Sequence, residues 1–455
     1  MNPELLRNVW VELTERRLLL TGVVIAALLL LSLTSGGLEG AVGTAETVFY
    51  GIVVVWGTRM AANAVVEEIA GKTWDAQRLS AIAPWTMVWG KLLGATALAW
   101  LGGLICLSVI VFADLTGDRP GQALDDIVYF AGMGLFAHAV AMMASLVAVR
   151  RRLSHSRFDV FIYQLFGLIA AGLVWRVWQT ADPDSLFRRW NGGSAVLDTV
   201  RWWGLDYTAS GFYVGSLLSF VAWTLIANYR LMRTELQVRN GPLVWLAFIA
   251  YVAIYAAGFD EWRNYIIALD ARIGIRAVQA GLALAVVTYV MAFVEPKEVV
   301  AYRWLVRRFG RGHLFAFVAR LPAWAFAYAA TFAAGIVVIV FIPWDQATIG
   351  NSDFGRGGTV VAAGLGFLLR DCGIFIIMGL GQVGKRSDLG ALAILGLAYV
   401  ILPGLLGGYG SGAGVFFFPG PFEPTWLNPL LAWGQAIFVW ALILRRPDLH
   451  EPAPS

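Results

Sequence analysis

The chain has 455 residues, of which 59% are hydrophobic and only 14% are charged, and its formal net charge is +4. These values exclude an ordinary water-soluble domain, and the absence of a lysine- or arginine-rich block argues against nucleic acid as a partner. They predict an all-α polytopic membrane protein that contacts membrane lipids. The two cysteines, Cys106 and Cys372, lie in apolar runs far apart in the sequence, so we interpret them as packing residues and not as a disulfide or metal site.

The N-terminal residues 2–16 are predicted to form an amphipathic helix on the inner membrane surface. Acidic residues at positions 4, 12 and 15 distinguish this stretch from the basic leader of a signal peptide. One helical face carries Leu5, Leu6, Val9, Trp10 and Leu13.

Apolar runs long enough to cross a bilayer follow one another along the chain and predict about twelve transmembrane helices. They lie near residues 18–34, 47–66, 86–112, 127–149, 160–178, 208–228, 243–258, 275–294, 323–343, 358–380, 389–407 and 428–444. When the loops are assigned alternately to two sides, most Lys and Arg residues fall on one of them. The positive-inside rule makes that side cytoplasmic, so both termini are predicted to be cytoplasmic in a bacterial-type inner membrane.

Weak internal similarity predicts that the chain is a duplication. Glu-Leu pairs at residues 4 and 235 open similar stretches, and Asp159 and Asp388 each precede a Gly-Leu pair by the same interval, so the halves are offset by about 230 residues. A linker at 295–324 follows the eighth run as the linker at 67–91 follows the second. We therefore predict two parallel six-helix repeats, residues 1–232 and 233–455.

The linker at 67–91 is a polar interruption between two strongly apolar runs. The spacing of its charges predicts one short surface helix that ends before Pro84, with Trp74 over Arg78 and with Glu67 and Glu68 directed outward. Such a linker suggests a docking surface for a cytosolic partner. An interfacial helix that only anchors the bundle remains the alternative.

The order of residues in this linker resembles the membrane subunits of ATP-binding-cassette exporters, most closely the type-two permeases of drug, polysaccharide and lipid export. The family linker runs Glu, Gly-Thr, Leu, Pro and Gly-Lys, and the matching residues here are Glu67 or Glu68, Gly71, Thr73, Leu79, Pro84, Gly90 and Lys91. The second linker keeps Glu295 and Pro322 but lacks the Gly-Thr and Gly-Lys elements.

The resemblance implies an exporter permease, not an enzyme, that forms a path for an amphiphilic or lipid-like substrate. It implies that ATP and Mg are bound by separate ATPase subunits, two of them for a twelve-span fusion, and that this chain itself holds no cofactor and no catalytic or metal-binding residue. The residues expected to couple to the ATPase are Glu67, Glu68, Gly71, Trp74, Asp75, Arg78, Pro84, Glu295, Glu298 and Arg303.

Arg370 and Asp371 fall near the middle of the tenth apolar run, where an isolated charge is costly. Adjacent residues of a helix point about 100° apart, which predicts that the two do not simply neutralise each other. They either line a polar substrate path or have a structural partner on another helix. His138, among apolar residues of the fourth run, is interpreted as a hydrogen-bonded core histidine.

Two other segments resemble functional motifs. Residues 379–385 match a glycine-rich phosphate loop, but a membrane span precedes them and Arg386 stands where Ser or Thr is needed, so we interpret them as an interfacial turn. Residues 407–424, rich in Gly and aromatic residues, are predicted to form an outer re-entrant or cap loop.

Two other functions stay open. Six-plus-six secondary transporters of the major facilitator type carry a Gly-x-x-x-Asp element between their second and third spans, and Gly71 and Asp75 have that spacing, although the linker here is more than twice as long. A lipid-linked glycosyltransferase would need a catalytic acid in the first outer loop, where only Glu39 and Glu46 occur.

Overall fold

The structure, a computed structural model, is mostly helical. The residues it describes are 2–80, 82–117, 120–151, 157–181, 199–238, 240–259, 269–310, 312–313, 317–318, 320–341, 348–349, 352–353, 357–380, 387–406, 412–420, 422 and 424–449. Within these ranges, nine helices are long and apolar enough to cross a membrane, and two shorter apolar helices span Leu243–Ala257 and Leu389–Leu405. The length and apolar composition of these helices confirm the prediction of an all-α polytopic membrane protein.

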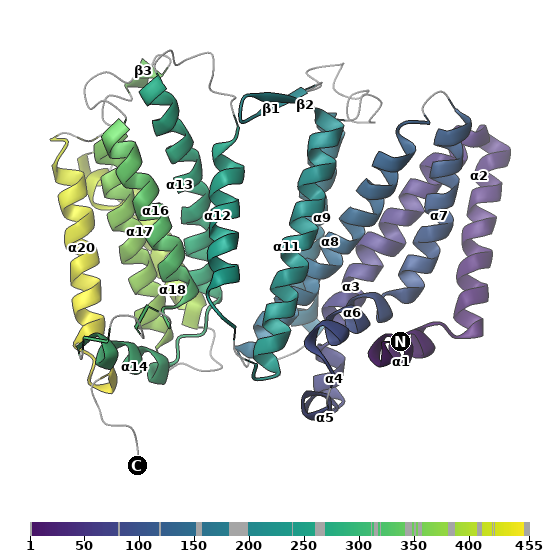
Figure 1. The fold of residues 1–455 in the computed structure, drawn as a ribbon, viewed down its shortest axis with the longest axis horizontal. Helices are drawn as coiled ribbons and strands as arrows, with labels where there is room; N and C mark the ends of the chain where they lie inside the picture. Colours follow the sequence, from purple (N-terminus) through teal and green to yellow (C-terminus); the bar gives the residue numbers. More distant parts are fainter. Residues whose placement is uncertain are drawn as a thin grey trace. The chain divides into compact units, whose positions relative to one another are not determined.

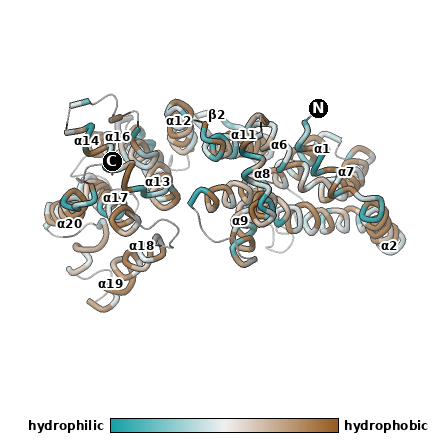
Figure 2. Tube along the Cα trace, turned by 90° about the horizontal axis from the view of Figure 1, so that it is seen from below, coloured by the Kyte–Doolittle hydropathy of each residue, from teal (hydrophilic) through white to brown (hydrophobic). Residues whose placement is uncertain are grey.

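The spanning helices expose large apolar side chains, such as Leu19, Leu282 and Ile437. In Figure 2 hydrophobic residues dominate these helices, whereas hydrophilic stretches occur in α1 (Pro3–Glu12) and α14 (Val299–Gly310). Exposure of so much apolar surface to water would be unfavourable, so these side chains face lipid.

The chain divides into two compact units, one made of residues 1–200 and 206–240 and the other of residues 201–205 and 241–455. The sequence-based boundary between Met232 and Arg233 lies inside α11 (Ala209–Glu235), which continues to Glu235.

The first unit holds α1 and α11 (Figure 1). Between them in the chain lie α2 (Glu15–Phe49), η1 (Tyr50–Gly57), α3 (Thr58–Asn63), α4 (Val66–Ala70), α5 (Trp74–Leu79), α6 (Pro84–Gly94), α7 (Ala97–Thr116), α8 (Ala123–Arg150) and α9 (Arg157–Ala181). The strands β1 (Thr199–Trp202) and β2 (Leu205–Thr208) follow α9 and form a two-stranded sheet, of which residues 201–205 are assigned to the second unit.

Helix α2 folds back on itself at Gly37, so that Ser32 on its first leg meets Gly40 and Thr44 on its second. Gly37 has φ 64° and ψ −156°, a conformation open to glycine but not to residues with a Cβ atom. The Ser32 hydroxyl donates to the Gly40 carbonyl at 2.6 Å, and the Thr44 hydroxyl donates to Ser32 at 2.7 Å. In a straight helix Ser32 and Thr44 would be about 18 Å apart.

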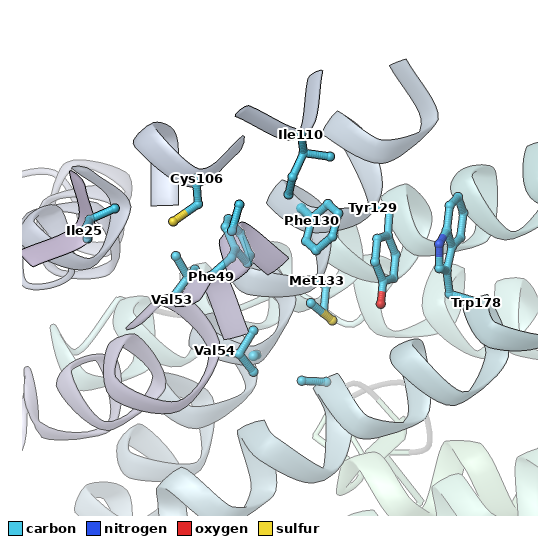
Figure 3. Close-up of a cluster of buried hydrophobic side chains, with 13 residues drawn as sticks. Ile25, Phe49, Val53, Val54, Cys106, Ile110, Tyr129, Phe130, Met133 and Trp178 are labelled. Carbon is cyan, nitrogen blue, oxygen red and sulfur yellow. The ribbon is translucent and has the colours of Figure 1, made fainter. Parts of the chain in front are cut away.

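The core of the first unit surrounds η1, a π-helical segment. Figure 3 shows Phe49, Val53 and Val54 packed with Phe130 and Met133. His138 is fully buried, and its Nε2 lies 2.8 Å from the Val53 carbonyl. The prediction of a hydrogen-bonded core histidine is confirmed.

The second unit holds the remaining elements. They are α12 (Leu243–Ala257), α13 (Leu269–Val294), α14, α16 (Ala323–Phe341), β3 (Thr348–Ile349), β4 (Ser352–Asp353), α17 (Gly357–Gly379), α18 (Ser387–Gly396), η3 (Leu397–Ile401), α19 (Leu402–Leu405), η4 (Gly412–Phe416), α20 (Leu427–Leu444) and η5 (Pro447–Leu449). Its largest core cluster centres on α17, with Leu368, Phe375 and Ile376 buried against Trp324 of α16.

Part of the predicted re-entrant loop is described, and it lies alongside α20. The Asn428 amide donates to the carbonyls of Val415 and Phe418, at 2.7 and 3.1 Å. The Gln435 amide donates to the Phe416 carbonyl at 2.8 Å. Gln435 is two turns into α20, about 12 Å from its start, so the segment 412–420 runs inward beside the helix. Residues 407–411, 421 and 423 of the predicted loop lie outside the described residues. The same holds for residues 381–385 of the phosphate-loop match, for Arg386, and for residues 182–198 between α9 and β1.

Candidate functional site

The polar linker of the first unit folds as two short helices, α4 and α5, and not as the single helix that was predicted. The break lies at Gly71–Thr73, where Lys72 has φ 56°. The amides of Gly71 and Thr73 donate to the carbonyls of Glu67 and Glu68, at 2.8 and 2.9 Å. The positive φ of Lys72 turns the chain, and α5 starts in a new direction at Trp74.

A buried lysine joins this linker to the bundle. The side chain of Lys91 on α6 is 1% exposed, and its Nζ lies 3.2 Å from Glu4 Oε1 and 2.9 Å from Gln77 Oε1. Nζ also donates to Glu68 Oε2 and lies 5.4 Å from the centre of the Trp74 ring. One ammonium group thus contacts α1, α4 and α5 at once.

Arg7 of α1 balances the charge of the cluster. It donates to Glu4 Oε1 at 2.9 Å and to Glu68 Oε1. Burial alone would lower the pKa of Arg7, but its hydrogen bond to Glu68 and the charges of Glu4 and Glu68 outweigh that effect and raise it. Two carboxylates therefore face two cations, which is the condition under which buried charges are tolerated. We refer to Glu4, Arg7, Glu68 and Lys91 as the linker cluster.

Two glycines on α6 allow α1 to approach closely enough for this contact. A Cβ atom at Gly90 would lie 2.5 Å from Glu4 Cγ, and one at Gly94 would lie 2.6 Å from Asn8 Cβ. The two glycines are four positions apart, so they lie on the same face of α6 and form one smooth stripe against which α1 packs. The Asn8 amide donates to the Gly90 carbonyl at 3.1 Å and closes the contact.

The linker residues predicted to meet an ATPase therefore fall into two groups. Glu68 and Trp74 were predicted to face outward, but they face the bundle, and Trp74 is only 5% exposed. The prediction that Trp74 lies over Arg78 is also wrong, because Lys91 occupies that ring and Arg78 Nε donates to the Glu235 carbonyl at 3.0 Å. Pro84 occupies the first turn of α6.

The outward surface of the linker is formed by the predicted residues Glu67 and Asp75 together with Lys72 and Leu79, which were not among the predicted coupling residues. Glu67, Lys72, Asp75 and Leu79 are exposed there, and Leu79 is 88% exposed. The outward side of the linker thus presents charged groups together with one large apolar side chain. We refer to these four residues as the outward face.

Glu67 has a raised pKa that predicts a measurable pH dependence. Although the residue is exposed, part of its carboxyl group is removed from water, which raises the pKa most, and the nearby carboxylates of Glu12 and Glu68 add to the shift. Protonation is thus favoured on folding. The stabilisation is fully present below the ordinary glutamate pKa of about 4.3 and is lost as the pH rises through the higher folded value. Glu67→Gln should therefore raise the thermal unfolding temperature relative to the unmodified chain at pH 8 and less so at pH 5.

The exposed Glu15 at the start of α2 provides the control for this prediction. Glu15→Gln should give no such difference between the two pH values. An equal effect of Glu67→Gln at both would contradict the assignment.

The second linker is built differently. Glu295 is turned inward, and its Oε1 accepts a hydrogen bond of 3.1 Å from the amide of Ala323 at the start of α16. Arg303 Nε donates to the Asp448 carbonyl at 2.8 Å, which ties α14 to η5. Of the three predicted coupling residues there, only Glu298 is exposed, so this linker does not repeat the arrangement of the first.

The two charges near the middle of α17 pair with each other. Arg370 Nε donates to Asp371 Oδ1 at 2.8 Å, and both residues are buried. The expectation that adjacent residues could not neutralise each other is wrong, because the long arginine side chain bends back over the short carboxylate. The 100° separation applies to Cβ directions and not to the ends of long side chains.

Three further side chains complete this buried cluster. The hydroxyls of Tyr289 on α13 and Tyr399 on η3 donate to Asp371 Oδ2 at 2.7 and 2.6 Å. Arg370 Nη1 donates to Gln435 Oε1 at 2.8 Å, and Gln435 in turn holds the 412–420 segment. We refer to Arg370, Asp371, Tyr289, Tyr399 and Gln435 as the α17 cluster. It links α13, η3, α20 and the inward-running segment to α17.

Tyr399 reaches the cluster from an irregular turn. Pro403 has no amide hydrogen, so the Tyr399 carbonyl lacks its usual helical donor four residues on. The chain forms the π-helical segment η3 there. Such turns often mark functional sites in helices.

Sequence reasoning missed most partners in both clusters. Glu4, Arg7, Gln77, Tyr289, Tyr399 and Gln435 were not among the predicted site residues, and Lys91 was noted only as part of a family pattern. One signal was available, because a lysine that follows glycine inside an apolar helix needs a carboxylate partner.

Comparison of the chain with protein-family models, with curated proteins and with solved structures gives no match.

Proposed function

We propose that this chain is the membrane subunit of an ATP-binding-cassette exporter, set in a bacterial-type inner membrane with both termini cytoplasmic. Separate ATPase subunits, two for the two units, bind ATP and Mg and dock on the linker of residues 66–79. This chain forms the path of an amphiphilic or lipid-like substrate and is not itself an enzyme.

The observation that carries the proposal is the two-sided linker. Its inward side is fixed to α1 and α6 through Lys91, whereas its outward face, with Leu79 exposed, stands outside the bundle. A displacement of α4 and α5 is therefore transmitted to the first and third spanning segments without loss in a flexible loop. A helix that served only as an interfacial anchor would place its apolar residues in the membrane and would not require a charged joint to two other helices.

The test is to change the outward face and leave the linker cluster intact. Leu79→Asp combined with Asp75→Lys should reduce ATPase co-purification and substrate-stimulated ATP hydrolysis at least tenfold, because interface anchors of this kind contribute about 1–2 kcal/mol or more each. The amount and the unfolding temperature of the chain should stay near those of the unmodified protein, since exposed changes cost roughly half a kcal/mol or less.

The matched control changes one exposed leucine elsewhere in the chain. Leu389→Asp, on α18 of the second unit, introduces the same side chain at another exposed leucine and should leave ATPase binding unchanged. If the Leu79 variant transports normally, or if transport needs no ATP, the permease proposal fails.

A second candidate function, ion-coupled secondary transport, is favoured by the α17 cluster. Buried ionisable residues in a membrane span commonly mark ion or proton pathways. The two candidates separate in one experiment on vesicles: an exporter permease needs ATP together with its partner, whereas a secondary transporter runs on an imposed ion gradient without either.

A further inference from the structure

Helix α14 lies across one end of the spanning helices of its unit (Figure 1, lower left). Leu305 is buried, and the Tyr302 hydroxyl accepts a hydrogen bond of 3.3 Å from the Trp324 indole at the start of α16. Together with the Arg303–Asp448 bond, these contacts fix the helix in place. The inward side of α14 is therefore occupied by contacts within the unit, whereas its other side is available to a ligand.

Two guanidinium groups share one aromatic ring on the exposed side. The Cζ of Arg308 lies 5.1 Å from the centre of the Trp304 ring, and that of Arg320 lies 4.3 Å from it. Among the described residues, no acidic side chain forms an ion pair with either arginine. Both positive charges lie beside one ring, and an anion bound next to them would offset their mutual repulsion. Stacking on the indole leaves the N–H edges of each guanidinium free to bind phosphate oxygens.

The position of this ring indicates where the phosphate comes from. Val300 lies one turn from Trp304 on the same ridge of α14 and is 72% exposed, and Phe309 is 62% exposed. Trp324, at the mouth of a spanning helix, marks the level of the membrane interface. A basic amphipathic helix with exposed apolar side chains at that level fits a lipid surface, in which the arginines meet headgroups and the apolar residues meet acyl chains.

We propose that Trp304, Arg308 and Arg320 bind the phosphate of an anionic phospholipid. The inference is independent of the exporter proposal.

Native mass spectrometry of the purified full chain can test this site. The chain would be released from nanodiscs made of phosphatidylglycerol and phosphatidylcholine with the same acyl chains. The unmodified protein should retain phosphatidylglycerol preferentially, and Arg308→Gln with Arg320→Gln should lower that preference on the order of tenfold or more, because each arginine near an anionic surface contributes substantially to binding. Arg308→Lys with Arg320→Lys, which keeps both charges but loses the planar fork, should fall between the two.

The control removes two exposed arginines elsewhere, Arg16→Gln with Arg445→Gln, and should lower the preference far less, because neither arginine lies beside Trp304. If the double glutamine variant does not fold, Trp304→Leu removes the stacking surface without a change in charge and should also lower the preference. The proposal is overturned if the Arg308 and Arg320 variant retains phosphatidylglycerol as the control does. It is equally overturned if that variant keeps its lipid but loses its ATPase, since α14 would then be a protein-docking helix.

Discussion

Replacement of Lys91 by methionine is expected to destabilise the protein severely. Methionine keeps the length and most of the volume of the side chain, but Glu4 and Glu68 would then face each other in a buried site with Arg7, itself 46% exposed, as the remaining cation. Removal of one partner from a buried ion pair costs roughly 3–5 kcal/mol. The yield of monodisperse protein and the thermal unfolding temperature should both fall clearly.

Two further variants make this result specific to the linker cluster. Lys72→Met removes an exposed lysine from the same linker and should change stability by no more than about half a kcal/mol. Lys91→Met combined with Glu68→Gln restores the charge balance and should recover a substantial part of the loss, with a coupling energy of roughly 0.5–3 kcal/mol. If Lys91→Met behaves like Lys72→Met, the linker is not joined to the bundle in the way described.

The spanning helices could be predicted from the sequence because their signal is local. An apolar run of sufficient length can be recognised without knowing which other helices it packs against. Most predicted runs therefore coincide with helices. A turn between the first two runs was predicted, but its helical form was not. Residues 35–46 looked like a loop, yet they are helical on both sides of Gly37, and one glycine with a positive φ is enough to reverse the chain.

The sites were harder to predict because their partners are distant in sequence. Lys91 is 87 residues from Glu4 and 23 from Glu68, and no spacing rule connects such positions. The predicted pairing of Trp74 with Arg78 followed the i,i+4 rule. On an isolated helix, a pair of side chains at this spacing contributes only a few tenths of a kcal/mol. Burial of Trp74 against Lys91 outweighs such a contact, because desolvation strengthens the cation–π interaction.

The α17 cluster should respond to substitution as strongly as the linker cluster. Asp371→Asn leaves the buried Arg370 charge without its carboxylate, so that only neutral amide oxygens, such as that of Gln435, remain to accept its hydrogen bonds. We expect a loss of roughly 3–5 kcal/mol, seen as a lower yield of folded protein and a lower unfolding temperature. Tyr399→Phe removes one of the two hydroxyl donors to Asp371 and should cost less, about 1–3 kcal/mol.

The double variant Arg370→Gln with Asp371→Asn removes both charges and decides what the cluster is for. It leaves no unpaired ion in the span, so it should fold much better than Asp371→Asn alone. Failure of the double variant to recover would contradict the pairing of the two side chains and would point to another partner for Asp371.

Transport per folded molecule of the double variant then separates the two roles. If the charges line the substrate path, the recovered protein should transport poorly although it is abundant and stable, because the path has lost its polar contacts. If the charges only hold α13, η3 and the 412–420 segment to α17, transport should return together with folding, since Tyr289, Tyr399 and Gln435 can still bond to the amides that replace the ion pair. Activity normalised to the amount of correctly folded protein is therefore the measurement that matters, and expression level alone would confuse the two outcomes.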